Sequence, residues 1–314
     1  MKTITYICLS LSAAVCVPCP AAEAPAPTAP ATSQSRTRAE PVTVILSALS
    51  EETASLERSL TDKQEWKIQG IRFVAGRIGA RHVVLAAGGM GKVNAAVVAT
   101  LAIDHFQPSE VLFSGIAGCL NPELGLGDIV IAERTVQHDL LSLERQKVLP
   151  MEIFSPVDGK KNPEYFPADP RLLKVAQTAA TRLQKRMEDK APAPPTDAGG
   201  PRREHSTPRI VTGLVVTGDM FVGANAKKAE LQHRYHADAV DMEGAAVAQV
   251  CYQFRVPCLI IRCVSDLADD AADADVETFM KSAADNAARF TTLIVAALDA
   301  ARVPATGPAA ATAP

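Results

Sequence analysis

The stretch AVDMEGAAVAQVC, residues 239–251, combines an apolar run typical of a buried strand with a run of small residues typical of a buried helix. Two carboxylates, Asp241 and Glu243, stand where the strand would pass into the helix. Burying an unpaired carboxylate costs free energy, so each one needs hydrogen-bond donors from the fold or from a ligand. The stretch therefore predicts a strand–helix unit with either a structural network or a binding site at its junction.

The segments on both sides of this stretch continue the alternation of strand and helix. The predicted strands are VTVILSAL, IRFVAGRIGARHVVLAAGG with a hairpin turn near Gly79, EVLFSGIAG, GDIVIAERTV, RIVTGLVVTGD and PCLIIRCVSD. The predicted helices are EETASLERSL, GKVNAAVVATLAIDHF, DPRLLKVAQTAATRLQKR, AKKAELQHRY and VETFMKSAADNAARFTTLIVAAL. Such alternation indicates a single α/β domain whose mixed, mostly parallel twisted sheet is flanked by helices.

The two ends of the chain differ in composition from this domain. Residues 1–22 have a charged start, a short apolar run and small residues, which are typical of a signal peptide, and residues 23–40 form a Pro/Ala-rich linker. The domain is then predicted to cover residues 41–302, with a surface insertion at 186–208, and residues 303–314 are predicted to form a disordered tail. We therefore expect a periplasmic or secreted protein with no membrane segment beyond the signal.

Charge and aromatic content exclude one class of partner. The formal net charge is −3, no long basic run occurs, and aromatic residues make up only 4% of the chain. A nucleic-acid-binding surface needs clustered positive charge, and a single-strand platform also needs aromatic rings. We expect no nucleic-acid partner.

The cysteines and histidines do not form a metal-binding pattern. Cys119, Cys251, Cys258 and Cys263, which lie outside the signal, lack CxxC spacing and are predicted to be small buried hydrophobic residues. The neighbours His138 and Asp139 are predicted to form a structural pair. We expect neither a metal nor a cofactor.

Polar residues gather at the predicted carboxyl ends of the strands, where open α/β sheets bind ligands. These positions are 51–52, 115–118, 217–221, 241–243 and 265–266. One acidic residue at such a place is often a helix cap, but several carboxylates at one edge are what acid/base chemistry at a glycosidic bond requires. Arg262 interrupts the apolar CLIIRCV and is expected to pair with a carboxylate at the same edge.

Six stretches occur in an order that carries a family resemblance: SALSEETASL, GGMGKVNAA, SGIAGCLNPELGLGDIV, TGDMF, VDMEGAAVAQVC and RCVSDLAD. Together they resemble the nucleoside phosphorylase/nucleosidase superfamily, and most closely the 5'-methylthioadenosine/S-adenosylhomocysteine nucleosidases. The resemblance covers residues 42–302 and implies a nucleoside phosphorylase-like fold and N-glycosidic hydrolysis of adenine nucleosides that carry a 5'-thio group. It also implies a small-molecule nucleoside substrate and a homodimer in which one subunit's loop completes its neighbour's pocket.

The resemblance implies three catalytic residues. Glu52 corresponds to the carboxylate that orients and deprotonates the attacking water, and Arg262 to an arginine near that water. Asp266 corresponds to the acid that protonates adenine N7 as the base leaves. These roles suit an oxocarbenium-like transition state, because protonation improves the leaving group and a nearby carboxylate stabilises positive charge on the sugar.

The resemblance also implies a set of substrate-binding residues. Glu243 corresponds to the acceptor of the ribose hydroxyls, and Phe221 to the ring stacked on adenine. Met242 would pack beneath the sugar, the backbone of Val222 would bind the purine edge, and Met90 would line the 5'-alkylthio pocket. Two strand-end residues, Gly118 and Ser265, complete the predicted set.

Three positions depart from the family pattern, and two other functions stay open. Ile116 replaces a small hydroxyl residue that helps to hold the water, Cys119 replaces a glycine, and Val276 replaces an aromatic residue of the 5' pocket. One alternative is a phosphate-dependent purine nucleoside phosphorylase, although its arginine is absent from the turn SALSEET. The other is a non-catalytic exported nucleoside-binding or adhesion protein, which Ile116 favours and the three retained carboxylates oppose.

Overall fold

The computed structural model describes residues 40–144, 147–188 and 208–300. The predicted signal peptide, nearly all of the linker, the tail and most of the 186–208 insertion lie outside these residues. Among the described residues, no helix is long and apolar enough to cross a membrane. The predicted α/β domain begins at β1 (Val42–Ser47) and ends with α6 (Ala272–Ala300).

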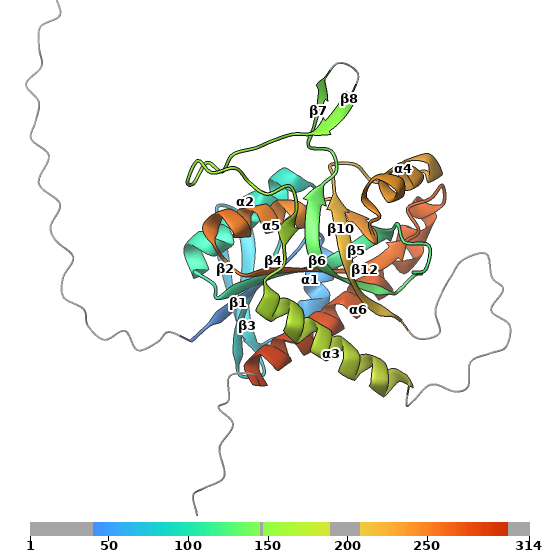
Figure 1. The fold of residues 1–314 in the computed structure, drawn as a ribbon. Helices are drawn as coiled ribbons and strands as arrows, with labels where there is room; N and C mark the ends of the chain where they lie inside the picture. The colour runs from blue at the N-terminus through green and yellow to red at the C-terminus, as the bar shows by residue number, and fades with distance from the viewer. Residues whose placement is uncertain (1–39, 145–146, 189–207, 301–314) are drawn as a thin grey trace, which may run out of the picture. The chain divides into compact units, whose positions relative to one another are not determined.

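The sheet is mixed, with parallel strands at its centre (Figure 1). β1 pairs in parallel with β4 (Arg81–Ala87) on one side and with β5 (Glu110–Cys119) on the other. β12 (Cys258–Asp266) is parallel to β5 and antiparallel to β6 (Ile129–Gln137). Because β1, β4, β5 and β12 run the same way, their carboxyl ends meet at one edge of the sheet.

Beyond β6 the sheet curls and closes on itself. β10 (Ile210–Thr217) is parallel to β6 and to the short β11 (Ala239–Asp241), and β11 then pairs in antiparallel with β5. β11 is the strand predicted from AVD, and α5 (Gly244–Phe254) is the helix predicted to follow it. The closure brings the β11–α5 junction next to the ends of β5 and β12.

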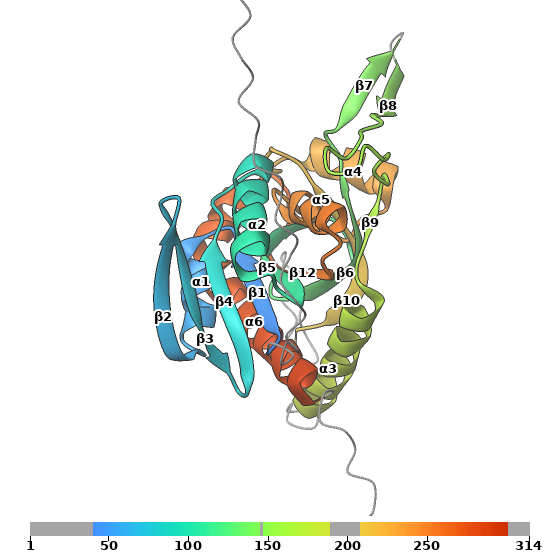
Figure 2. The ribbon, with the colours of Figure 1, turned by 90° about the vertical axis from the view of Figure 1, so that its left-hand side faces the viewer.

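Helices cover both faces of the sheet (Figure 2). α2 (Lys92–Phe106) packs beside α5 on one face, and α1 (Ser50–Glu57), α3 (Pro170–Glu188) and α6 pack on the other. α4 (Asn225–Tyr235) contributes Leu231 and Tyr235 to a third apolar cluster. The predicted helices on both faces are confirmed.

Three antiparallel additions were not predicted. The hairpin of β3 (Ile71–Ile78) and β4 is confirmed, but β2 (Thr61–Ile68) adds a further edge strand to it. β2 is polar and exposed, so its sequence lacks the apolar alternation of a strand. β7 (Leu141–Glu144) and β8 (Lys147–Pro150) form a separate hairpin, and β9 (Phe166–Pro167) pairs with β6.

Candidate active site

Glu52 is held between the start of α1 and the end of β5. Its Oε2 accepts hydrogen bonds from the backbone N–H groups of Ala48 at 2.9 Å and Leu49 at 2.8 Å, and its Oε1 accepts one from Ile116 at 2.8 Å. Burial raises the pKa of Glu52, against the Arg262 charge and the backbone donors, which act to lower it. A buried carboxylate of raised pKa is suited to take up a proton.

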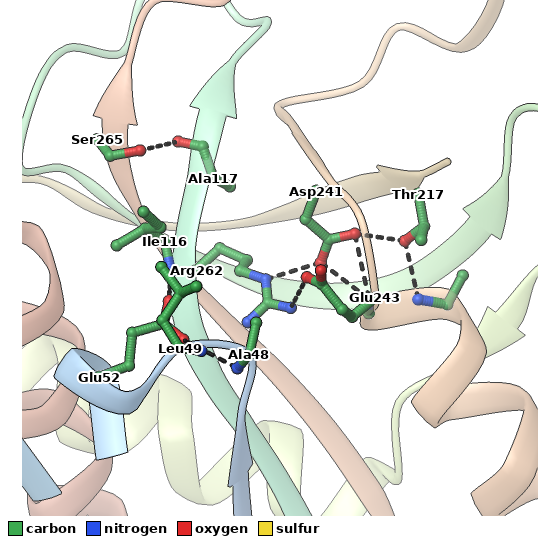
Figure 3. Close-up of polar contacts among 12 residues, drawn as sticks. Ala48, Leu49, Glu52, Ile116, Ala117, Thr217, Asp241, Glu243, Arg262 and Ser265 are labelled. Carbon is green, nitrogen blue, oxygen red and sulfur yellow. Dashed lines mark hydrogen bonds and ion pairs between the residues drawn. The ribbon is translucent and has the colours of Figure 1, made fainter. Parts of the chain in front are cut away.

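Arg262 lies at the centre of the site, between Glu52 on one side and Asp241 and Glu243 on the other (Figure 3). Its Nε donates to Asp241 Oδ2 at 2.7 Å, which confirms the predicted carboxylate partner at the same edge. Its guanidinium carbon lies 4.1 Å from the centre of the Phe113 ring. Both Nη atoms are buried without a hydrogen-bond partner among the described residues, so the guanidinium has donors free for a ligand or water.

Gly115 leaves room for the side chains of Glu52 and Arg262 to approach each other. A Cβ atom at Gly115 would lie 2.6 Å from Glu52 Oε1 and 2.8 Å from Arg262 Nη1, which is too close for either contact. The sequence prediction placed Gly115 at a strand end but gave it no role. The structure shows that a side chain here would push the carboxylate and the guanidinium apart.

Asp241 belongs to the structural part of the network. Its Oδ1 accepts a hydrogen bond from Thr217 Oγ1 at 2.5 Å, and Thr217 Oγ1 in turn accepts one from the Ala245 N–H at 2.8 Å. The Gly244 N–H also donates to Asp241, at 3.1 Å to Oδ2. With Arg262 on the same carboxylate, Asp241 has its hydrogen bonds supplied by the fold.

Glu243 is less completely bonded. Its Oε1 accepts the Gly91 N–H at 2.9 Å, and its Oε2 lies 3.8 Å from Arg262 Nη2. Burial and the neighbouring Asp241 charge raise the pKa of Glu243 to about 7, although Arg262 and the Gly91 N–H act to lower it. The stretch AVDMEGAAVAQVC therefore holds one carboxylate bonded by the fold and one with capacity for a ligand.

Asp266 ends β12 beside the end of β5. Its Oδ1 accepts the Ala268 N–H at 2.9 Å, and its Oδ2 accepts the Ser265 hydroxyl at 2.8 Å. Burial raises the pKa of Asp266, although these two donors act to lower it. A Cβ atom at Gly118 would lie 2.9 Å from Asp266 Oδ1, so this glycine leaves room for the carboxyl group. Asp266, Ser265 and Gly118 thus form a second small cluster on the same strand pair that carries Arg262.

The remaining predicted residues lie on the turns around these clusters. Val222 is buried, Met242 is partly exposed, and Phe221 and Met90 are 47% and 62% exposed. Met90 precedes Gly91, whose N–H contacts Glu243, so the Met90 turn borders that carboxylate. Val276 is partly buried in the first turns of α6.

The predicted pairing of His138 with Asp139 is wrong. Both ring nitrogens of buried His138 lack a hydrogen-bond partner among the described residues, and the ring packs against Gly218. Asp139 instead accepts hydrogen bonds from Lys92 Nζ and from the Asp219 N–H. The donors come from turns far away in the sequence, so no local pattern could have found them.

The four cysteines outside the predicted signal are buried, as expected, and all four are free thiols. Cys258 and Cys263 both lie in β12. Within the described ranges, no group of three or more His, Cys, Asp or Glu side chains is arranged to hold a metal ion.

Comparison with known proteins links this site to a family. A family model described as the phosphorylase superfamily matches residues 42–299. The 5'-methylthioadenosine/S-adenosylhomocysteine nucleosidase of Mycobacterium tuberculosis is 37% identical over 82% of this chain and 99% of its own length. That of Staphylococcus epidermidis is 32% identical over 81% of this chain and 99% of its own.

Solved structures show the same fold. The nucleosidase of the same name from Neisseria meningitidis, in complex with methylthio-immucillin-A, has a TM-score of 0.68 at 30% identity and covers 81% of this chain and 98% of its own. A futalosine hydrolase of Helicobacter pylori also has a TM-score of 0.68, at 28% identity, and covers 82% of this chain and 97% of its own. Proteins similar to this chain thus include hydrolases with two differently named substrates.

Proposed function

This chain belongs to the phosphorylase superfamily and, within it, to the family of the 5'-methylthioadenosine/S-adenosylhomocysteine nucleosidases, and on that premise we propose that it hydrolyses adenine nucleosides with a 5'-thio group. The products would be adenine and a free sugar. The observation that carries the proposal is the placement of Glu52, a buried carboxylate of raised pKa, beside Arg262, whose Nη atoms have no hydrogen-bond partner among the described residues.

The hydrogen bonds of Glu52 favour water over phosphate as the nucleophile. The N–H groups of Ala48, Leu49 and Ile116 are the donors that an anion at this turn would need, and the Glu52 carboxylate already occupies them. A phosphate at the same place would lose these donors and meet a like charge. This geometry supports hydrolysis rather than phosphorolysis.

In the proposed reaction, Glu52 takes a proton from the water as the water oxygen bonds to the sugar carbon C1'. Arg262 directs its free Nη donors to that water or to its neighbours. The C1'–N9 bond breaks, its electron pair goes to the purine, and Asp266 delivers a proton to adenine N7. Glu243 accepts hydrogen bonds from the ribose hydroxyls and, as an anion, stabilises positive charge that develops on the sugar.

Ile116 does not remove the anchor of Glu52. The contact between residue 116 and Glu52 Oε1 comes from the backbone N–H, which any residue except proline supplies. The hydroxyl that relatives place here would add one more bond to the water, and Arg262 still has donors for that purpose. This arrangement supports an active enzyme over a protein that only binds nucleosides.

The base and the 5' group would lie against the turns on the other side of Glu243. Phe221 would stack on adenine, the backbone of buried Val222 would bind the purine edge, and Met242 would pack beneath the sugar. Met90 would line the 5' pocket. Its high exposure supports a pocket that is open on this side in a single chain.

We also propose that the protein is a homodimer, with a partner loop that covers this open side. Large apolar side chains are exposed on α2, on the β7–β8 hairpin and on the segment after it: Val93, Val97, Leu143, Val148, Leu149, Met151 and Phe154. Exposed apolar side chains of this size are a feature of protein–protein interfaces. Sedimentation of the purified protein tests the proposal, and a monomer at micromolar concentration would contradict it.

Export is a separate proposal that rests on the sequence of residues 1–22 alone. We expect the mature chain to begin near residues 22–25, in a periplasmic or secreted fraction. Mass spectrometry of the native protein tests this expectation. A chain that retains Met1 in a cytoplasmic fraction would contradict it.

The function itself is tested by product analysis. The mature protein is incubated with 5'-methylthioadenosine, S-adenosylhomocysteine, adenosine and futalosine, with and without phosphate. We expect adenine and a free reducing sugar from the two 5'-thio nucleosides in phosphate-free buffer. A strict requirement for phosphate with a sugar 1-phosphate product would show a phosphorylase, and preference for futalosine would correct the 5' group.

A further inference from the structure

Asp139, just beyond the end of β6, joins two turns that are far apart in the sequence. Its Oδ1 accepts a hydrogen bond from Lys92 Nζ at 2.6 Å, and its Oδ2 accepts the Asp219 N–H at 2.9 Å. Lys92 directly follows the β4–α2 turn, residues 88–91, and Asp219 lies in the β10–α4 turn, residues 218–224. These turns carry Met90 and Phe221, which we place against the 5' group and the base.

A third contact closes the triangle. Asp219 Oδ1 accepts the backbone N–H of Lys92, the first residue of α2, at 2.8 Å. The N-cap residue of α2 is a glycine and offers no side-chain cap of its own, so the Asp219 carboxylate supplies the negative charge that a helix N-terminus favours. The Lys92 side chain is only 17% exposed, so water screens its pairing with Asp139 less than a surface ion pair.

This triangle adjoins the ribose-binding carboxylate through one residue. Gly91, immediately before Lys92, donates its N–H to Glu243 Oε1 at 2.9 Å. Gly91 has φ +93°, which other residues rarely adopt, and a Cβ atom there would lie 3.1 Å from Asp219 Oδ1. The direction of the Gly91 N–H is therefore set by the backbone that Asp219 and Lys92 hold.

We propose that Asp139, Lys92 and Asp219 form a clamp that aims the Gly91 N–H at Glu243 and so holds this carboxylate in the orientation that the ribose hydroxyls need. The inference rests on the proposed function for its kinetic consequence, but not for the clamp itself. The three side chains are positioning residues, because they act through Gly91 rather than by touching the substrate.

The charges around Glu243 show why the clamp alters its protonation. Glu243 is faced by Asp241 from β11, Glu52 from α1, Arg262 from β12 and the Gly91 N–H at the start of α2. Of these, only Arg262 and the N–H act to lower the pKa of Glu243, so losing the N–H raises that pKa further. Burial acts to raise the pKa of Asp139, but the Lys92 side chain and the Asp219 N–H lower it overall, so Asp139 is ionised at neutral pH.

The kinetic test uses Asp139→Asn in the full chain. An amide has one acceptor oxygen, so its NH2 group must face one of the two donors and one bond is lost. We expect kcat/KM for 5'-methylthioadenosine to fall about 10- to 100-fold, through a higher KM. In the pH profile of kcat/KM, we expect the decline on the acid side to begin at a higher pH than in the wild type. Lys92→Met should do the same, and Lys92→Arg should recover part of the loss because it keeps the charge.

The matched control is Glu57→Gln, which breaks the ion pair of Glu57 with Arg72 at 2.9 Å. This pair joins the end of α1 to β3, away from the two turns, so neither kcat/KM nor its pH profile should change. An Asp139→Asn enzyme whose acid limb stays at the wild-type pH would overturn the clamp. Should Asp139→Asn fail to fold, Lys92→Met decides the same question.

A second readout needs no activity. Amide hydrogen exchange of Gly91 in the ligand-free protein should be faster in Asp139→Asn and in Lys92→Met, and unchanged in Glu57→Gln. Unchanged exchange in both clamp variants would overturn the inference even in a fully active enzyme. If the wild type releases no adenine, the proposed function fails, while the exchange measurement still tests the clamp.

Discussion

Two buried arginine–carboxylate clusters lie at opposite edges of the same sheet. At the amino-terminal edge, Glu110 accepts hydrogen bonds from Thr43 Oγ1 at 2.6 Å, from Arg171 at 2.9 Å and from Arg81. Arg81 Nε also donates to Thr43 Oγ1 at 2.9 Å. Here two arginines, the buried Arg81 and the half-exposed Arg171, surround one buried carboxylate, and the members of the cluster bond one another.

The cluster at the carboxyl-terminal edge has the opposite balance. One arginine, Arg262, faces Glu52, Asp241 and Glu243, and among the described residues neither of its Nη atoms has a hydrogen-bond partner. Excess negative charge and unused donors cost stability in the empty protein. Burial and charge pairing therefore do not by themselves mark a functional site. The useful signal is a network that remains incomplete until a ligand binds.

The largest expected difference between the clusters is in turnover. Arg262→Met removes the donors beside Glu52 and should lower kcat about 10²- to 10³-fold, as the loss of a transition-state donor does. Arg81→Met should leave kcat per folded molecule unchanged but destabilise the protein by about 3–5 kcal/mol, because Glu110 loses a buried partner. The kcat and the free energy of unfolding in denaturant are measured for both variants. Equal losses of kcat in Arg262→Met and Arg81→Met would contradict a functional difference between the two clusters.

Removing a carboxylate should change stability with opposite signs at the two edges. The pKa of Glu243 is raised from 4.5 to about 7 in the folded protein. Its contribution to the free energy of unfolding is therefore fully present below pH 4.5 and is lost as pH rises through 7. Glu243→Gln should therefore stabilise the ligand-free protein at pH 8 by about 3 kcal/mol, with little effect at pH 4. Glu110→Gln should destabilise it by about 1–3 kcal/mol, because charged donors lose their acceptor. Thermal unfolding at pH 4 and pH 8 measures these changes. A Glu243→Gln protein that is less stable than the wild type at pH 8 would contradict the expectation.

The pH dependence of activity should show the same raised pKa. Because Glu243 must be ionised to accept the ribose hydroxyls, kcat/KM should decline as pH falls below about 7, by about tenfold per unit. An ordinary exposed glutamate would stay ionised to a far lower pH. Initial rates between pH 5 and 8 measure the acid limb. A kcat/KM that stays constant down to pH 5 would show that activity does not require an ionised Glu243.

The sequence predicted those parts of the fold and site that depend on local pattern. Apolar runs predicted the central strands because these strands are buried on both faces. A carboxylate partner was predicted for Arg262 because a guanidinium is rarely buried unless it is paired. The polar edge strand β2 was missed, because it forms by hydrogen-bonding to β3 and not by burying apolar side chains. The β11–β5 closure and the Asp139 clamp were also missed, because both depend on contacts between segments far apart in the chain.

The central claim is that the incomplete cluster and Asp266 together catalyse bond cleavage, and Asp266→Asn tests it most directly. Asparagine can keep both existing contacts, because its oxygen can accept the Ala268 N–H and its NH2 can donate to the Ser265 hydroxyl. Adenine release from 5'-methylthioadenosine in phosphate-free buffer is measured beside calorimetric binding of an unreactive nucleoside analogue. The account predicts turnover lower by about 10²- to 10⁴-fold with nearly unchanged binding. An Asp266→Asn protein that cleaves at close to the wild-type rate would contradict it.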